Sequence, residues 1–507
     1  MRNNAIFVGL ITFLLEIHSS GSGKILMLHG ALGPSHKKSM APLMAALADR
    51  GHNVSIWDMF FVPIPTSDKR INTIYSELVT DDREMLDSLV YHNDSLLSKR
   101  LWESSETGNF LLGIAWSITI DICKMAVEQK LNDFRSLTAE KWDLVVVDPI
   151  FTPCGIAVTK FTTAPTFLYS TTIVYSHTHR AQGVPIPIGS APVGNVIDYK
   201  LDGILDRLSE LLVWGLGHEI TMPLLSWHMN RLIAPIIGRS LNIFELESEA
   251  PFLFDQIASN IFHPAPQTHT YKHIGNVDCA VFKKFNLTDE VYRNFVDDPK
   301  SKGTIVAAFG HHTTFTPVPH IVNALLEGFK RLPDYRFVWQ ANGVDAVLAA
   351  KVPNVKLVHW LPQKELLAHP KTKAFISHMG AKSTFEAVCL GVPLLALPIF
   401  AEQHLHTRLL IKHHKCGDYL DKHTMSADDV YQKLVGIISH QEHYKRNLNR
   451  VNWILSDMIM SSIDEGVFWM EFTMRHQEHM HLLQSKAKSM GWIKYFMVDA
   501  VLLKRYH

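Results

Sequence analysis

Apolar runs alternate with amphipathic segments in the first half of the chain. The runs at residues 24–28, 52–58 and 142–148 are predicted strands, and the last is continuous enough for burial on both faces of a sheet. A helical pattern at residues 39–49 ends at Gly51, a common C-terminal stop. This alternation predicts a parallel sheet with helices on both sides.

The same alternation returns in the second half. Predicted strands lie at residues 303–310, 335–340, 355–360, 373–378 and 392–398, with predicted helices at 317–331 and 383–390. The chain therefore encodes two similar α/β units joined end to end. From residue 425 onward the pattern is helical with no strand signal, and we expect this tail to pack back across the body.

Segments of different composition lie before and between these units. Residues 1–20 combine Arg2, an apolar run and small residues, which predicts a signal peptide. Residues 251–277 are rich in Pro, His, Asn and Gly and are predicted to form a linker. The predicted division of the chain is 1–20, 21–250, 251–277, 278–440 and 441–507.

The two ends of the chain and its sequons bear on its compartment. Asn-x-Ser/Thr sequons at Asn53, Asn93 and Asn286 are compatible with a lumenal or secreted protein. A membrane span needs about 20 apolar residues, and the chain reaches His507 before completing one. We therefore expect C-terminal helices at 441–507 without a complete membrane span, this span being either absent or truncated.

Composition excludes several classes of protein. Hydrophobic residues make up 47% of the chain and charged residues 19%, so it is not a disordered sequence. Lys and Arg number 49 and Asp and Glu 49, so no net charge draws the chain to nucleic acid. The five cysteines are widely spaced without a CxxC pair, which predicts neither a disulfide framework nor a metal site. A metal-dependent hydrolase is disfavoured because no HExxH motif occurs.

Two polar residues follow predicted strands of the first unit. His36 lies in the loop after the first strand, and Asp148 ends the strand at 142–148. Ligands of open α/β sheets bind beyond the carboxyl ends of the strands, and a histidine oriented by a carboxylate can remove a proton from a hydroxyl. Spacing alone does not bring the two together. The alternative is a turn histidine and an aspartate that caps a loop.

The strand-to-helix junction near residue 380 is suited to an anion. His378 and Gly380 follow a predicted strand, and Ser383 lies at the N-terminus of the next predicted helix. Backbone N–H groups and the positive end of the helix dipole form an anion pocket at such a junction. A diphosphate would fit there.

Three further residues surround this junction in the sequence. Glu386 lies one turn into the helix, where its carboxylate can accept two ribose hydroxyls. Trp360 offers a flat apolar face to a base, and Gln363 offers a donor and an acceptor to its edge. Each residue alone has an ordinary structural explanation: Trp360 as core, Glu386 as a solvated helix charge and His378 as a capped turn. Together they predict a nucleotide site.

The stretch 360–403 resembles the signature of the UDP-glycosyltransferases, closest to the animal UDP-glucuronosyltransferase branch. The resemblance extends over nearly all of the chain and includes GPSHKKSM at 33–40, DPIFTPCG at 148–155 and the helix at 467–482. It implies the GT-B architecture, in which two doubly wound, Rossmann-like domains face each other and C-terminal helices pack back across the body. The domain at 21–250 would bind the acceptor, and the domain at 278–440 the UDP-sugar.

The resemblance also implies a mechanism and a set of roles. Transfer would invert the anomeric carbon without metal or cofactor, with His36, steadied by Asp148, deprotonating an acceptor hydroxyl. The implied donor-binding residues are Trp360 for uracil, Gln363 for uridine, His378, Gly380 and Ser383 for the diphosphate, Glu386 for ribose, and Glu402 and Gln403 for the sugar hydroxyls. The co-substrates would be a UDP-sugar and a small lipophilic alcohol, phenol or acid.

The sequence departs from the family pattern in the donor half. The departures are Met379 in place of Gly, Lys382 in place of Asn, Glu402 in place of Asp, and His311 in place of Ser. Met379 replaces glycine beside the expected phosphates, where a side chain restricts the backbone. The alternative function is therefore a non-catalytic member of the fold that binds a lipophile or a protein partner.

The donor sugar, acceptor and partners are read from the resemblance. Asp255 falls where members that use glucuronate carry an arginine, which favours glucose over glucuronic acid because a sugar carboxylate facing Asp255 would be repelled. Apolar stretches at 101–125 and 211–236 are candidates for an acceptor pocket, with helix core as the alternative. The family resemblance allows peripheral membrane contact and homo- or hetero-oligomers, and places the protein in the endoplasmic reticulum lumen or outside the cell.

Overall fold

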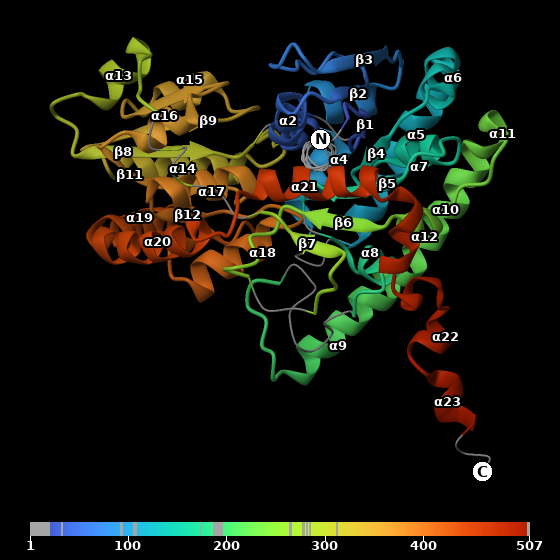
Figure 1. Ribbon diagram of the computed structural model, residues 1–507. Coiled ribbons are helices and arrows are strands. Elements are labelled where there is room, and N and C mark those ends of the chain that lie inside the picture. Colours follow the sequence, from blue (N-terminus) through green and yellow to red (C-terminus); the bar gives the residue numbers. More distant parts are fainter. Residues whose placement is uncertain are drawn as a thin grey trace, which may run out of the picture.

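The computed structural model describes residues 21–503, except 32–33, 92–94, 105–108, 173, 186–195, 263–265, 276–278, 280–281, 283–284 and 311–312. The predicted signal peptide, the sequon at Asn93 and the departure at His311 lie outside the described residues. The described chain forms two parallel sheets side by side, each covered by helices (Figure 1). The C-terminal sheet lies on the left in this view and the N-terminal sheet on the right.

The N-terminal sheet has seven strands in the order β3-β2-β1-β4-β5-β6-β7, all parallel. Its strands are β1 (Lys24–Leu28), β2 (Asn53–Phe60), β3 (Asn72–Glu77), β4 (Leu144–Val147), β5 (Thr166–Ser170), β6 (Phe252–Asp255) and β7 (Tyr271–His273). Every residue of β4 and β6 is buried, as expected for a sheet with helices on both faces.

The prediction of a linker at 251–277 was wrong. Both β6 and β7 fall in this segment and extend the N-terminal sheet beyond β5. The reason is physical: Phe252–Asp255 is a four-residue strand buried on both faces, too short to show a period, and Pro251 precedes it. The carboxyl end of β6 therefore belongs to the same sheet edge as those of β1, β4 and β5.

The helices of the N-terminal half cover both faces of its sheet. They include α2 (Pro34–Asp49), α3 (Arg83–Leu86), α4 (Leu96–Glu103), α5 (Asn109–Gln129), α6 (Leu131–Ala139), α7 (Pro153–Thr159), α8 (Ser176–Ala181), α9 (Ile204–Leu212), α10 (Thr221–Leu232), α11 (Ala234–Ile237) and α12 (Ile243–Glu249). One core layer includes Trp57, Trp116 and Ile120, and a second includes Met40 and Leu43 of α2. The sheet is thus buried between two layers.

The C-terminal sheet has six parallel strands in the order β10-β9-β8-β11-β12-β13. Its strands are β8 (Gly303–Ala308), β9 (Tyr335–Gln340), β10 (Val355–Val358), β11 (Thr372–Ser377), β12 (Leu394–Ala396) and β13 (Gly417–Tyr419). Its helices include α13 (Glu290–Val296), α14 (Pro319–Lys330), α15 (Ala346–Ala350), α16 (Gln363–Ala368), α17 (Ala381–Leu390), α18 (Gln403–Thr407), α19 (Ala427–Ser439) and α20 (Gln441–Ser456). The five predicted strands are present, and β13 is an additional edge strand.

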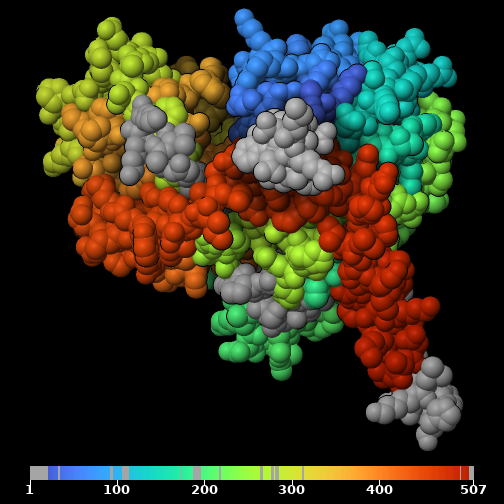
Figure 2. Space-filling model, viewed as in Figure 1, coloured from blue at the N-terminus to red at the C-terminus, as the bar shows by residue number. Residues whose placement is uncertain are grey.

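The C-terminal tail packs back across the body, as expected. Helix α21 (Ser462–Arg475) crosses the N-terminal half (Figure 1) and packs on α2. Its Val467 and Met470 are buried in the same core cluster as Leu43 of α2. The short helices α22 (Trp492–Tyr495) and α23 (Val498–Leu503) then extend away from both sheets (Figure 2). Among the described residues, no helix is both long enough and apolar enough to span a membrane.

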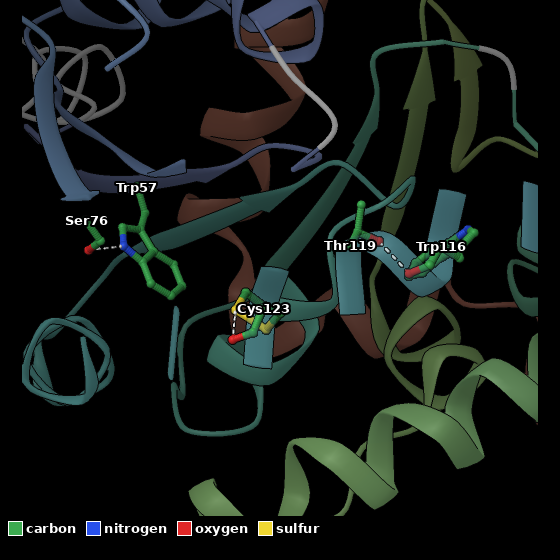
Figure 3. Close-up of a disulfide and its surroundings, with 6 residues drawn as sticks. Trp57, Ser76, Trp116, Thr119 and Cys123 are labelled. Atoms are coloured by element: carbon green, nitrogen blue, oxygen red, sulfur yellow. Dashed lines mark hydrogen bonds between the residues drawn. A yellow bond between two sulfur atoms is a disulfide. The ribbon is translucent and has the colours of Figure 1, made fainter. Parts of the chain in front are cut away.

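Two disulfides correct the expectation drawn from the cysteines. Cys123 of α5 is bonded to Cys154 of α7 (Figure 3). Cys279 is bonded to Cys389 of α17. The partners are 31 and 110 residues apart, so no local spacing marked them, and the buried free Cys416 made the total odd. The first disulfide joins α5 to α7. It lies in the core cluster that also contains Trp57 and Trp116, both labelled in Figure 3.

Candidate active site

The N-terminal sheet brings together the two residues predicted to act as base and partner. His36 Nδ1 lies 2.8 Å from Asp148 Oδ2, and both side chains are buried. The residues are 112 positions apart in sequence. With its Nδ1–H donated to the carboxylate, the imidazole carries its lone pair on Nε2, the arrangement that a general base requires.

Neighbouring strands fix this geometry. Asp148 follows β4, its backbone N–H donates to the Leu28 carbonyl at the end of β1, and its Oδ1 accepts from Ile150 N at 3.2 Å. His36 lies in the first turn of α2, the helix that follows β1. A Cβ at Gly30 would lie 2.7 Å from the Ile150 carbonyl oxygen and 3.1 Å from His36 Nδ1. Only glycine leaves room for this approach.

A third member, Thr171, was missed from the sequence. Its hydroxyl donates to Asp148 Oδ2 at 2.5 Å, and its oxygen lies 2.7 Å from His36 Nδ1. Thr171 directly follows β5, the neighbour of β4 in the sheet. Its position after a strand was the only signal in the sequence, and the neighbouring Ser170 and Thr172 share it.

An aromatic wall stands beside the imidazole. The Phe151 ring meets His36 edge-on with centroids 6.2 Å apart, and the Trp116 ring lies 5.8 Å from that of Phe151. Phe151 has a positive φ of 60°, a strained conformation for a bulky side chain that occurs often at functional sites. The surroundings of His36 on the side of Phe151 are therefore apolar.

In the C-terminal half, three predicted donor residues contact one another. Gln363 Nε2 donates to Ser383 Oγ at 3.0 Å and to Glu386 Oε2 at 2.6 Å. Burial raises the pKa of Glu386 even though Gln363 and Lys364 counteract it. The helices α16 and α17 thus place an amide, a hydroxyl and a carboxylate at one point.

His378 lies where β11 leads into α17, between two glycines. A Cβ at Gly310 would lie 2.9 Å from His378 Nε2, and one at Gly380 would lie 2.5 Å from the same atom. Burial lowers the pKa of His378 to about 4. The ring is therefore neutral near pH 7, and it can donate one N–H to an anion at the N-terminus of α17.

Trp360 joins the two halves of the site. Its side chain is 68% exposed, and its carbonyl accepts from Tyr292 OH at 2.6 Å. The ammonium of Lys38, two residues after His36 on α2, lies 5.6 Å from the centre of its ring. The helix that carries His36 thus reaches Trp360, the residue predicted to stack on uracil.

The departures Met379 and Lys382 are accommodated differently. Met379 has a φ of 67°, the left-handed conformation that glycine adopts most readily, but its side chain is fully buried in the core. Its carbonyl accepts from His406 Nδ1 at 2.9 Å. Partial removal from water and repulsion by Lys38 lower the pKa of Lys382 to about 8. Lys38 of the N-terminal half and Lys382 of the C-terminal half are therefore close enough to repel each other.

The side chain of Gln403 hydrogen-bonds to the backbone of the loop that precedes it. Its Oε1 accepts from the backbone N–H groups of Ile399 and Phe400 at 2.8 and 3.1 Å, and the side chain is buried. Glu402 lies partly exposed at the N-terminus of α18. The amide oxygen of Gln403 is thus committed to the loop that presents Glu402.

The expectation that Asp255 would face the donor sugar was wrong. Asp255 ends β6 and is fully buried, and it accepts from Tyr271 OH at 2.6 Å, His273 Nδ1 at 2.8 Å and Ile257 N at 3.0 Å. This carboxylate is satisfied inside the N-terminal half, so it does not present a free charge to a donor sugar. The resemblance placed Asp255 in a linker near the donor sugar, whereas Asp255 ends β6, a strand of the N-terminal sheet.

Comparisons with known proteins agree with this architecture. UDP-glucuronosyltransferase 2B33 of Macaca mulatta is 26% identical over 499 residues, which cover 95% of this chain and 90% of that protein. UDP-glucuronosyltransferase 1A1 of Mus musculus is 27% identical over 366 residues, which cover 72% of this chain and 66% of that protein. The crystal structure of Os79 from O. sativa in complex with UDP has a TM-score of 0.58 and 17% identity, and the match covers 89% of this chain and 100% of Os79.

The solved neighbour confirms the fold that the resemblance implied, a GT-B arrangement of two Rossmann-like halves. The family model described as "UDP-glucoronosyl and UDP-glucosyl transferase" matches residues 23–504, nearly the whole chain. The protein is therefore a glycosyltransferase that belongs to the UDP-glucuronosyl and UDP-glucosyl transferase family.

Proposed function

We propose that the protein transfers glucose or glucuronic acid from a UDP-sugar to a hydroxyl of a small lipophilic acceptor, with inversion at the anomeric carbon. The observation that carries this proposal is the buried His36–Asp148–Thr171 cluster at the carboxyl edge of the N-terminal sheet. It supplies an oriented base, and Lys38 on the same helix approaches the donor half at Trp360.

In this mechanism His36 Nε2 accepts the proton of the acceptor hydroxyl. The oxygen attacks the anomeric carbon on the face opposite the departing UDP, so that the new glycosidic bond forms as the bond to the diphosphate breaks. Asp148 stabilises the imidazolium that results, and Thr171 holds the carboxylate in place. The N-terminus of α17 and the cationic Lys382 offset the charge that develops on the diphosphate.

The donor residues are assigned by their proposed contacts. Trp360 stacks on uracil, Gln363 binds the uridine and Glu386 binds the ribose, while the diphosphate lies against His378, Gly380 and Ser383. The contacts of Gln363 with Ser383 and Glu386 support a common ligand for the three. Glu402 and Gln403 lie near the sugar in this proposal, with Glu402 the residue that binds its hydroxyls.

The compartment proposed is the endoplasmic reticulum lumen or the cell exterior. Two disulfides support an oxidising environment. Ile204, Leu205 and Leu208 of α9 are exposed, which supports peripheral contact with a membrane surface. Association with other copies or family members stays a prediction.

The test is turnover of UDP-glucose and UDP-glucuronate with a panel of phenols. His36→Ala should lower kcat by roughly 10² to 10⁴-fold, the usual contribution of a general base. The matched control is His320→Ala, on the exposed start of α14, which should keep full activity. The anomeric configuration of the product, read by NMR, should be opposite to that of the donor.

Calorimetric titration with UDP separates this proposal from the alternative of a non-catalytic binding protein. UDP should bind wild type and His36→Ala with the same affinity, because His36 belongs to the acceptor half. Equal turnover in wild type and His36→Ala would refute the role of the base. Failure of wild type to bind UDP would favour the non-catalytic alternative.

A further inference from the structure

A buried lysine follows the proposed base. Lys37 is only 2% exposed, and its Nζ lies 2.9 Å from Oδ2 of Asp58, which is fully buried on β2. Lysine and aspartate are rarely buried unless they are paired. Neither residue touches the donor residues described above, so their burial needs an explanation of its own.

Lys37 and Asp58 also hydrogen-bond to the backbone of the loop that follows β2. Lys37 Nζ donates to the Ile64 carbonyl, and Ile64 N donates to Asp58 Oδ2 at 3.2 Å. One residue of the loop after β2 is thus held by both members of the ion pair. These contacts join α2, β2 and the loop after β2 at Lys37, the residue that directly follows His36.

His29 completes the cluster from the end of β1. Its Nε2 lies 3.4 Å from Asp58 Oδ1, and its Nδ1 lies 2.9 Å from the Gly30 carbonyl oxygen. Gly30 is the residue whose missing side chain leaves room for the His36 ring. Burial raises the pKa of Asp58, but contacts with His29 and Lys37 outweigh it and hold the pKa below its usual value. Asp58 is therefore a charged centre.

We propose that Lys37, Asp58 and His29 form a buried polar triad around the Lys37–Asp58 ion pair, and that this triad positions the His36 imidazole through α2 and through Gly30. This inference rests on the proposed function, because it assigns positioning residues to the same base. A buried ion pair contributes little net stability compared with apolar residues of the same size, but its directional bonds fix one geometry. Turnover is sensitive to displacements of about 1 Å at a reacting group.

The first experiment replaces Lys37 with methionine, which keeps the length of the side chain and removes its charge and donors. Lys37→Met should lower kcat by about tenfold or more, while the calorimetric affinity for UDP stays within threefold of wild type. The matched control is Lys302→Met, which breaks the exposed Lys302–Asp334 pair of 2.7 Å in the C-terminal half and should leave kcat unchanged.

A second readout does not depend on turnover. Diethyl pyrocarbonate modifies exposed imidazoles, and peptide mass spectrometry follows the rate at His36. The rate at His36 should rise at least fivefold in Lys37→Met, while the rate at His378 stays that of wild type. If wild type shows no transfer with any donor, the proposed function fails and this rate alone decides the inference.

Thermal unfolding identifies whether each variant is folded. Where Lys37→Met does not fold, His29→Gln replaces it, because it leaves the Lys37–Asp58 pair in place and removes the link to Gly30. The same loss of kcat and faster modification of His36 are expected. In a folded variant, kcat within twofold of wild type would overturn the inference. For an inactive wild type, an unchanged modification rate would overturn it.

Discussion

At the residue scale, the site depends on a carboxylate that is buried and fully hydrogen-bonded. Asp148 accepts from His36, Thr171 and the backbone of Ile150. A buried charge is strongly destabilising unless such partners satisfy it. The same contacts fix the tautomer of His36, so the stability of the cluster and its chemistry have one origin.

The first residue-scale prediction concerns Thr171. Thr171→Val keeps the shape of the side chain and removes the hydroxyl that donates to Asp148. A hydrogen bond to a charged group contributes about 1.5–3 kcal/mol, so kcat should fall about ten- to a hundredfold with UDP affinity unchanged. Steady-state kinetics measure this. Thr159→Val, at the end of α7, is the control, and equal kcat in the two variants would contradict the role of Thr171.

The second concerns His404, which is buried in α18. Burial lowers its pKa from 6.5 to about 4. The unfolded chain therefore binds a proton near pH 6.5 that the folded chain resists until about pH 4, so stability falls as the pH drops through this window. His404 alone should account for about 2 kcal/mol of the unfolding free energy that is lost between pH 7 and pH 5.

Urea unfolding at pH 7 and pH 5 checks this value. In His404→Asn the loss of stability between the two pH values should be smaller than in wild type by about that amount. His320→Asn, which changes an exposed histidine, should keep the wild-type pH dependence. An unchanged pH dependence in His404→Asn would mean that other groups cause the acid sensitivity.

At the element scale, the site is made where parallel strands end and helices begin. His36 follows β1, Asp148 follows β4, Thr171 follows β5 and His378 follows β11. The strands β1, β4 and β5 are neighbours in the N-terminal sheet, which places side chains from distant parts of the sequence at one edge. The glycines at these junctions leave room for the imidazoles.

The element-scale prediction concerns Gly380, which caps α17. A methyl group there would lie 2.5 Å from His378 Nε2, so Gly380→Ala should displace the ring and weaken UDP binding about tenfold or more. Calorimetry with UDP measures this. Gly436→Ala in α19 is the matched control because its methyl group meets no atom within 4 Å. Equal UDP affinity in both variants would argue against His378 as a diphosphate ligand.

At the scale of the whole molecule, the tail holds the two halves together. Helix α20 packs on α17 in the C-terminal half, and α21 then packs on α2, the helix that carries His36. Glu471 of α21 is buried and accepts from His52 Nε2 at 3.2 Å and from Arg50 at 3.3 Å. The tail is thus joined to the N-terminal half through α2 and through the contacts of Glu471 with Arg50 and His52.

The whole-molecule prediction concerns these contacts. Glu471→Gln keeps the shape but removes the charge that the buried His52 and the partly exposed Arg50 contact, and weakening these hydrogen bonds should cost about 1.5 kcal/mol of unfolding free energy. Glu465→Gln is the control, since its pair with Lys272 is 3.8 Å long and partly exposed and should contribute less than about 1 kcal/mol. Denaturant unfolding compares the two. A loss no greater than that of the control would show that α21 is held by apolar packing alone.

Local sequence patterns were enough to predict the fold class and the candidate site residues. Apolar periodicity is a local property, and it predicted β1, β4, β8 and the junction at His378. Short strands carry no such signal: β6 and β7 are too short for a period to show, and the composition of their segment predicts a linker instead.

Only the tertiary structure decided which distant groups meet. The pairing of His36 with Asp148 and Thr171, the two disulfides and the Lys37–Asp58 pair all join residues from separate elements, and sequence spacing carries no distance between them. The structure likewise decided that Met379 is buried and that Asp255 is satisfied within its own half. Burial and hydrogen bonding depend on what packs around a residue, which no local pattern contains.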